Sequence, residues 1–488
     1  MRNKSLFKNI LYNFIYTGLN LLFPLITAPY VSRILGASNL GKVNFAIVIV
    51  NWFILFATFG TVTYGIREIA KIRNNQEQLN KLFSEIFVIN GAMSLIVTII
   101  YYFVIFNISN FTLESPLFLI LSLSIILNMF SIDWFFQGIE EYRYITIRNA
   151  FIKIFSLICI FLFIKQEDHY VLFGLISVIA SGLNGILNYL YSRRYVKLQF
   201  KNIKPLRHFK FLKIFFMHTF VVNIYTNADQ ALLGFLIDTK AVAFMNRTKT
   251  VVSMAVAIST AISNATLPRA SYYIKKDKLK FRQLLSGVPN FILWVTIPIT
   301  IGCICLAPNI MFILGGGEFL EATLLFQILA LTIIFSPLAT YLQYQVLVAS
   351  DKEKLGLYCS IITSFLSLLL NIILIPIIGF LAAGIVQVIS EISSVSMRYY
   401  IAKKKLGYTE INFITKSSFS YIAAALLMSG VVIYIRSIFN SLVLSFVIGA
   451  FAGALVYFIV LLLMKEKVTM IILNKFKGLV FKRLSNRH

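Results

Sequence analysis

Ionisable side chains within or beside long apolar segments are the residues whose types and positions suggest chemistry. Arg33 lies just beyond the apolar run 9–31, and Asp229 lies well inside the run 211–236. Arg247 and Lys249 lie near the start of the next run, 242–267. Each such group costs about 2.5–3.5 kcal/mol at the centre of a membrane helix, so it is usually kept for binding or transport. The three cations would bind an anion, and Asp229 would need a basic partner, for which we expect Arg247.

Other ionisable residues in the apolar runs have simpler explanations. Lys153 and Arg398 lie near the ends of their runs, where a long side chain can reach the interface. Glu391 shares a helix face with Arg398, so the two could satisfy each other, although Glu391 is also a candidate for ion coupling. Arg436 has the position of an interface anchor, and Asp133 carries no further signal.

Polar residues recur at helical spacing along four apolar runs, which are 9–31, 43–63, 211–236 and 242–267. Single residues of this kind usually join helices by hydrogen bonds. Four stripes that run the full length of their segments predict instead a hydrated central cavity. The cavity residues expected from these stripes are Asn13, Asn20, Asn51, Asn223, Asn227 and Asn246.

Enzyme motifs are missing from the sequence. We find no phosphate-binding glycine loop with a lysine and no pair of carboxylates in a polar loop that would bind a metal. Cys159, Cys303, Cys305 and Cys359 all lie in apolar runs without ligand partners nearby, so they are expected to be buried. We therefore expect no catalytic residue, no metal and no cofactor.

Composition places the chain in the lipid bilayer. Of its 488 residues, 59% are hydrophobic and only 13% are charged, and apolar runs long enough to cross a bilayer recur throughout. The net charge of +26 arises mostly from short loops, as the positive-inside rule describes, so a nucleic-acid partner is not expected. The fold class is therefore an all-α polytopic membrane protein.

About fourteen transmembrane helices are predicted from the apolar runs. Basic and weakly charged loops alternate between them, which predicts that both termini are cytoplasmic. The expected spans are 9–31, 43–63, 83–106, 116–137, 147–165, 169–191, 211–236, 242–267, 286–313, 322–348, 356–378, 380–400, 418–437 and 441–464.

An internal repeat is indicated by features that recur in the same order. Gly36 and Gly41 bracket an expected short turn beside Arg33, and the polar turn 237–240 precedes Arg247 in a similar layout. We therefore predict two six-helix lobes related by a parallel pseudo-twofold repeat, with two appended helices. The expected parts are the first lobe at 1–191, a cytoplasmic linker at 192–210, the second lobe at 211–400, and two extra helices with a basic tail at 401–488.

Several motifs resemble those of the polysaccharide transporter family, which belongs to the multidrug/oligosaccharidyl-lipid/polysaccharide exporter superfamily. They include PYVSRILGASNLGKVNF at 29–45, GIREIAK at 65–71, LGGGEF at 314–319, QVLVA at 345–349 and GFLAAG at 379–384. The resemblance implies a flippase for O-antigen or capsule repeat units in the bacterial cytoplasmic membrane. It also implies that Arg33 and Arg247 are cavity cations for an undecaprenyl-diphosphate-linked glycan, whereas no motif supports Lys249.

Two alternatives remain open. A drug or cation antiporter of the same superfamily would need anionic cavity residues, and the chain offers mainly Asp229. A membrane glycosyltransferase or polymerase would need a long outer loop with catalytic carboxylates, which the sequence lacks. A flippase would draw energy from an H⁺ or Na⁺ gradient, from the membrane potential or from consumption of its product. Contact with a polysaccharide polymerase would fit that last case.

Overall fold

The computed structural model describes the backbone of residues 6–108, 111 and 114–474. It describes their side chains except at 6–11, 13–14, 261–262 and 264–265. All regular secondary structure in these ranges is helical, as predicted. The chain divides into a first unit, Met1–Ala243, and a second unit, Phe244–His488.

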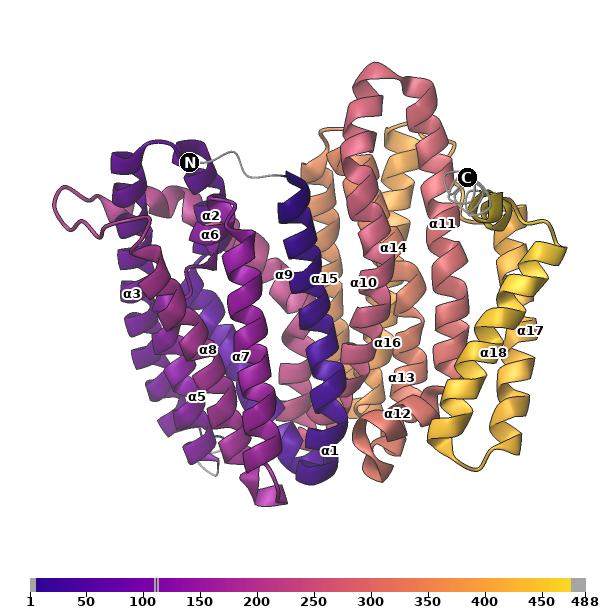
Figure 1. The fold of residues 1–488 in the computed structure, drawn as a ribbon, viewed down its shortest axis with the longest axis horizontal. Coiled ribbons are helices and arrows are strands. Elements are labelled where there is room, and N and C mark those ends of the chain that lie inside the picture. The colour runs from indigo at the N-terminus through magenta and orange to yellow at the C-terminus, as the bar shows by residue number, and fades with distance from the viewer. Residues whose placement is uncertain (1–5, 109–110, 112–113, 475–488) are drawn as a thin grey trace, which may run out of the picture. The chain divides into compact units, whose positions relative to one another are not determined.

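The first unit is a bundle in which α1 contacts α3, α5, α7 and α9, while α8 packs against α5 and α7 (Figure 1). The connector at residues 193–204, which is mostly non-helical, joins α8 to the short helix η3 and then α9. The helices are α1 (Leu6–Thr58), α2 (Thr61–Ile72), α3 (Gln76–Asn107), α5 (Ser115–Leu127), η1 (Asn128–Phe130), α6 (Asp133–Gly138), α7 (Tyr142–Phe163), η2 (Glu167–His169), α8 (Tyr170–Ser192), η3 (Pro205–His208) and α9 (Phe209–Leu236).

The expected turn between Gly36 and Gly41 is wrong in detail. Helix α1 has only one non-helical residue there, Gly36, whose φ of 70° and ψ of 171° separate two helical stretches. A left-handed φ of this kind favours glycine, because a side chain would be strained. Residues 37–41 are already helical. The predicted basic loop 64–82 is also largely helical, since α2 occupies most of its first half.

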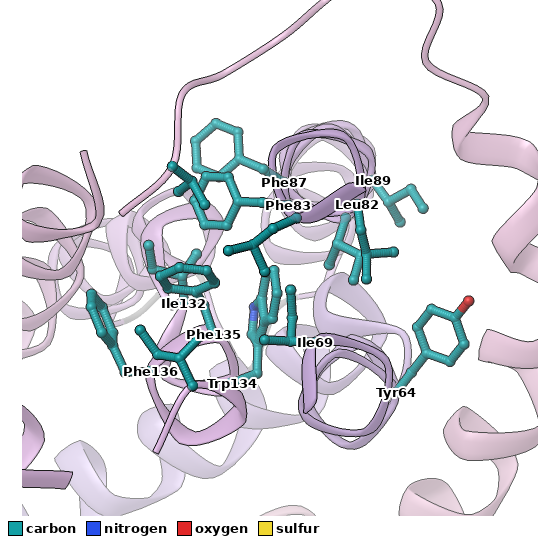
Figure 2. Packing of buried hydrophobic residues seen from close by; sticks show 14 of the residues in the cluster. Tyr64, Ile69, Leu82, Phe83, Phe87, Ile89, Ile132, Trp134, Phe135 and Phe136 are labelled. Atoms are coloured by element: carbon teal, nitrogen blue, oxygen red, sulfur yellow. The ribbon is translucent and has the colours of Figure 1, made fainter. Parts of the chain in front are cut away.

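An aromatic core closes the end of the first unit that holds the connector. Trp134 on α6 lies between Ile69 of α2 and Phe83 of α3, and all three are fully buried (Figure 2). Val196 of the connector and Leu212 of α9 belong to the same core. Burying an apolar side chain of this size contributes about 1.5–3 kcal/mol, so the connector and α9 are held to the bundle by packing.

The second unit is a helical bundle in which α16 packs against α13, α14 and α15, and α11 packs against α17. Helices α17 and α18 form an adjacent antiparallel pair (Figure 1). The helices are α10 (Thr239–Lys276, beginning in the first unit), α11 (Lys278–Cys305), α12 (Ala307–Gly315), η4 (Gly317–Ala322), α13 (Thr323–Ala330), α14 (Thr332–Tyr341), η5 (Leu342–Val348), α15 (Glu353–Ile378), α16 (Leu381–Tyr400), η6 (Ile401–Lys405), α17 (Lys416–Ile438) and α18 (Leu442–Leu463).

Ten segments within the described residues are long and apolar enough to cross a membrane. One of them, Ile15–Ile72, covers most of the first predicted span and all of the second. Helices α9, α10 and α16 cover three more predicted spans and are not among these ten. The polytopic membrane fold is confirmed, whereas the count of fourteen spans stays a prediction.

The topology can be tested with single cysteines in a variant that lacks the four native cysteines. We expect Asn202→Cys and Lys404→Cys to react with an impermeant maleimide only after the cytoplasmic face is opened, because their loops are basic. Asp168→Cys should react in intact cells. All three positions are exposed. Labelling of Asn202→Cys in intact cells would contradict the predicted orientation.

Candidate functional site

The kink in α1 is fixed by close contacts within the first unit. A Cβ atom at Gly41 would collide with the Thr239 carbonyl oxygen, and one at Gly234 would collide with the Phe45 ring. The two turns that the sequence analysis paired are therefore in direct contact, and glycine at position 41 permits the approach. Arg33 lies on α1 just before the kink and is exposed.

A small polar cavity lies beside this contact. It has a volume of about 220 Å³ and is lined by Lys42, Glu114 and Asp238 together with apolar residues. The Lys42 Nζ lies 2.7 Å from a Glu114 carboxylate oxygen, and the Tyr170 hydroxyl donates to the other oxygen at 2.7 Å. Both sides of the ion pair are partly exposed, so it contributes about 1 kcal/mol or less.

The predicted polar stripes are present on α1 and α9, with different surroundings. The Asn149 amide donates to Asn20 at 3.5 Å, and the Asn227 amide donates to Asn223 at 3.1 Å. Asn51 is exposed, and the side chain of Asn13 lies outside the described residues. Two of the asparagines thus satisfy each other along one helix, which supports a structural role for part of the stripe.

The charged candidates are distributed over both units. Asp229 on α9 is buried, and one of its carboxylate oxygens accepts a hydrogen bond from the Gln230 backbone N–H at 2.8 Å. On α10, Arg247 is buried, whereas Asn246 and Lys249 are half-buried. Asp229 belongs to the first unit and Arg247 to the second, so their pairing stays a prediction, as does the pairing of Arg33 with Arg247.

Arg398 is held inside the second unit by polar neighbours. Its guanidinium donates to Gln343 at 3.1 Å, to the Ser360 hydroxyl at 2.9 Å and to the Ser394 hydroxyl. Glu391, one turn closer to the start of α16 than Ser394, is also buried. Arg398 was expected to extend to the interface; instead it is buried and joins three helical segments, because these hydrogen bonds replace its contacts with water.

A buried polar cluster of the first unit was not predicted. Arg148 on α7 donates to Asp133 at 2.9 Å and to the Asn188 side-chain oxygen, and the Asn188 amide donates to the same Asp133 oxygen at 2.8 Å. The Arg148 guanidinium also lies 5.5 Å from the centre of the Tyr144 ring. Asp133 and Asn188 line a cavity of about 140 Å³. The predicted span began at residue 147, so Arg148 resembled an interfacial residue.

A second unpredicted cluster docks the connector onto α3. Glu85 is fully buried and accepts hydrogen bonds from Arg207 at 2.6 Å, from His208 at 2.8 Å and from the Lys204 backbone N–H at 2.8 Å. The carboxylate only accepts, so Nε2 of His208 carries the proton, and the Tyr64 hydroxyl lies 2.6 Å from the other ring nitrogen. Glu85 was overlooked because it lies near the start of its apolar run.

Three further side chains of α3 satisfy the connector backbone. Asn80 accepts from the Lys197 N–H at 3.0 Å, and Ser84 accepts from the Gln199 N–H at 2.9 Å. The Gln76 amide donates to the Tyr195 carbonyl at 2.6 Å. Residues 76, 80 and 84 are one helical turn apart, so they form a single row against an extended chain. The connector is therefore a docked element of the first unit.

Comparison with known proteins identifies the family. Residues 6–273, more than half of the chain, match the family described as "Polysaccharide biosynthesis protein". This chain belongs to that family. It is 24% identical over 359 residues to a Shigella dysenteriae protein assigned as an O-antigen transporter, covering 71% of this chain and 87% of that protein. It is 27% identical over 299 residues to a Haloferax volcanii protein assigned as a low-salt glycan biosynthesis flippase, covering 59% and 60% of the two chains.

Solved structures show the fold of this family member. The lipid II flippase MurJ in an inward closed conformation has a TM-score of 0.78 and 20% identity, covering 92% of this chain and 98% of that one. An inward-facing multidrug transporter of the MOP superfamily has a TM-score of 0.58 and 11% identity, covering 84% and 97%. The chain therefore shares the fold of these two proteins, and the relatives named here are transporters and flippases.

The Asp133–Arg148 pair predicts an asymmetric response to mutation. The Arg148 side chain is 2% exposed, whereas that of Asp133 is 29% exposed and reaches a cavity. Asp133→Ala leaves a buried cation without its counter-ion, which costs about 3–5 kcal/mol. Arg148→Met leaves a carboxylate that water can reach, so it should cost less. Thermal unfolding in detergent measures both, and equal losses, or full additivity in the double variant, would contradict the arrangement.

The connector clamp predicts a loss of stability when the charge of Glu85 is removed. Glu85→Gln removes the charge from the acceptor of three hydrogen bonds, each of which contributes about 1.5–3 kcal/mol. The bond from Arg207 contributes less, because this side chain is half-exposed and can bind water instead. We expect faster cleavage of the connector by trypsin, together with a lower unfolding temperature. The matched control is Glu77→Gln on the exposed start of α3. Identical cleavage rates for the two variants would show that Glu85 does not hold the connector.

Proposed function

We propose that this protein moves an oligosaccharide repeat unit, linked to undecaprenyl diphosphate, from the cytoplasmic to the outer leaflet. The observation that carries the proposal is the presence of two arginines in apolar segments of a glycan-transporter family member. Arg33 is exposed on α1 beside the kink, and Arg247 is buried on α10. Arginine is favoured for a diphosphate because its planar fork matches phosphate oxygens two at a time.

The chemistry of such a substrate fits the other features of the chain. Its diphosphate and sugars cannot cross hydrocarbon unaided, whereas its polyprenyl tail can stay in the lipid. A protein that moves it therefore needs polar groups along the path, and we assign this role to Asn20, Asn51 and Asn223 on α1 and α9. Alternating exposure of that path to the two sides would complete transport.

The finer parts of the proposal follow from charge. Arg33 and Arg247 receive the diphosphate as a pair, Lys249 adds positive charge, and Asp229 is held by Arg247. Asp229 and Glu391 are candidates for coupling to H⁺ or Na⁺. The protein resides in the bacterial cytoplasmic membrane with both termini inside, arranged as two six-helix lobes. Contact with a polysaccharide polymerase would remove the product outside.

Replacement of Arg33 tests this proposal. Arg33→Ala should lower export of lipid-linked repeat units about tenfold or more, because it removes charge-assisted hydrogen bonds to the diphosphate. Arg33→Lys should restore export only in part, since lysine keeps the charge and loses the fork. The measurement is surface polysaccharide in a strain whose own flippase is deleted, normalised to protein in the membrane.

The matched control is Arg436→Ala. Arg436 is also an exposed arginine on an apolar helix, and it donates to the Cys305 carbonyl at 3.2 Å. We expect this variant to export normally. If Arg33→Ala exports at the parental rate with normal abundance, Arg33 is an interface anchor and the diphosphate does not bind there.

A further inference from the structure

The largest cavity described here is lined by none of the residues assigned to the proposed transport path. It has a volume of about 560 Å³ and lies between α11 and the chain segment that follows α18. Gln283, Ser286 and Gly287 form its polar wall on α11, and Val468 and Ile471 form its apolar wall, with Lys467 beside them. Ligand pockets typically measure about 300–1,000 Å³, so this space can hold a small organic group.

The segment after α18 is a short helix over residues 467–474 that is firmly docked. The Glu466 carboxylate accepts from the Thr469 N–H at 3.0 Å and from the Tyr421 hydroxyl at 2.9 Å. Trp294 of α11 donates to the Thr469 hydroxyl at 3.0 Å. Glu466 and Thr469 thus hold one face of the short helix against the bundle, and Val468 and Ile471 are left to line the cavity.

The charge of Glu466 supports this docking. Burial raises the pKa of its carboxyl, but hydrogen bonds from the N–H groups of Thr469 and Val468 and from Tyr421 lower the pKa more, so the net shift is downward. An ionised Glu466 is a good cap for the start of a helix. The wall of the cavity is therefore built by specific contacts.

Charge around the cavity favours an anionic occupant. Lys467 is exposed and lines the cavity directly, whereas Glu466 is buried and turned to Tyr421. The cavity thus combines a cation, amide and hydroxyl groups, and aliphatic side chains. These are the groups that meet at a membrane surface.

We propose that this cavity binds the headgroup and upper acyl chain of an anionic phospholipid of the cytoplasmic leaflet. The phosphate lies at Lys467 and Gln283, and the acyl chain packs on Val468 and Ile471. The site is a lipid anchor that fixes the end of the second unit to a negatively charged membrane. It depends on the predicted cytoplasmic position of this end and is independent of the transported substrate.

Two variants act on the site by different means. Lys467→Ala removes the cation, and one lysine near an anionic membrane surface accounts for about a fivefold change in affinity. Gly287→Phe fills the cavity, because a Cβ there meets no atom within 4 Å and the backbone need not move. The matched controls are Lys465→Ala, an exposed neighbour that does not line the cavity, and Gly430→Phe, an equally open glycine on α17.

The full-length protein is placed in phosphatidylcholine nanodiscs with and without phosphatidylglycerol, and bound lipid is counted by native mass spectrometry. Wild type and both controls should retain phosphatidylglycerol and unfold at a higher temperature with it. Lys467→Ala should bind it about fivefold more weakly, and Gly287→Phe should not retain it.

Three results would overturn the proposal. The first is unchanged phosphatidylglycerol binding in both site variants. The second is equal retention of phosphatidylcholine, which would show that the charge of the headgroup is not recognised. The third is full competition by soluble glycerol phosphate, which would show a site for free phosphate instead of a lipid.

Discussion

Polar groups that this chain carries into apolar helices have to be satisfied by the protein itself, and both units depend on this constraint. Water cannot reach most of these groups, and an unsatisfied one costs several kcal/mol in hydrocarbon. Glu85 receives three donors from the connector and η3, and Arg148 is enclosed by Asp133, Asn188 and the Tyr144 ring. Each cluster joins elements distant in sequence, so the same bonds that satisfy a charge also fix the packing of helices.

This constraint separates structural charges from candidates for transport. The ion pairs of Glu85 and Arg148 are formed within the first unit, and Arg398 donates hydrogen bonds to polar side chains of the second. Arg33 differs because it remains exposed next to the kink in α1, where α1 meets the turn before α10. We therefore propose that Arg33 binds the diphosphate, and we assign structural roles to Glu85, Arg148 and Arg398.

Much of the fold was predictable, because a hydrophobic run of about 20 residues crosses a membrane as an α-helix, in which its backbone hydrogen bonds are satisfied within the segment. Helices α8, α16 and α18 begin and end within one residue of the expected limits. The kink at Gly36 was harder to predict, because a single glycine between two helical stretches gives the same sequence signal as a short turn. The clusters around Glu85 and Arg148 were not predicted, because hydropathy places charges near the end of a run at the interface. Only the packing of α3 and α7 shows that these two are buried.

Translocation of a defined substrate by the purified protein in lipid vesicles tests the central claim most directly. The substrate is a fluorescent oligosaccharide on undecaprenyl diphosphate, loaded on one side of the bilayer, and its arrival on the other side is followed by a quencher. We expect movement that depends on the protein and that a neutral, phosphate-free polyprenyl glycoside does not share, because the arginines select the diphosphate. Transport of an organic cation with no movement of the diphosphate-linked glycan would contradict the proposed function.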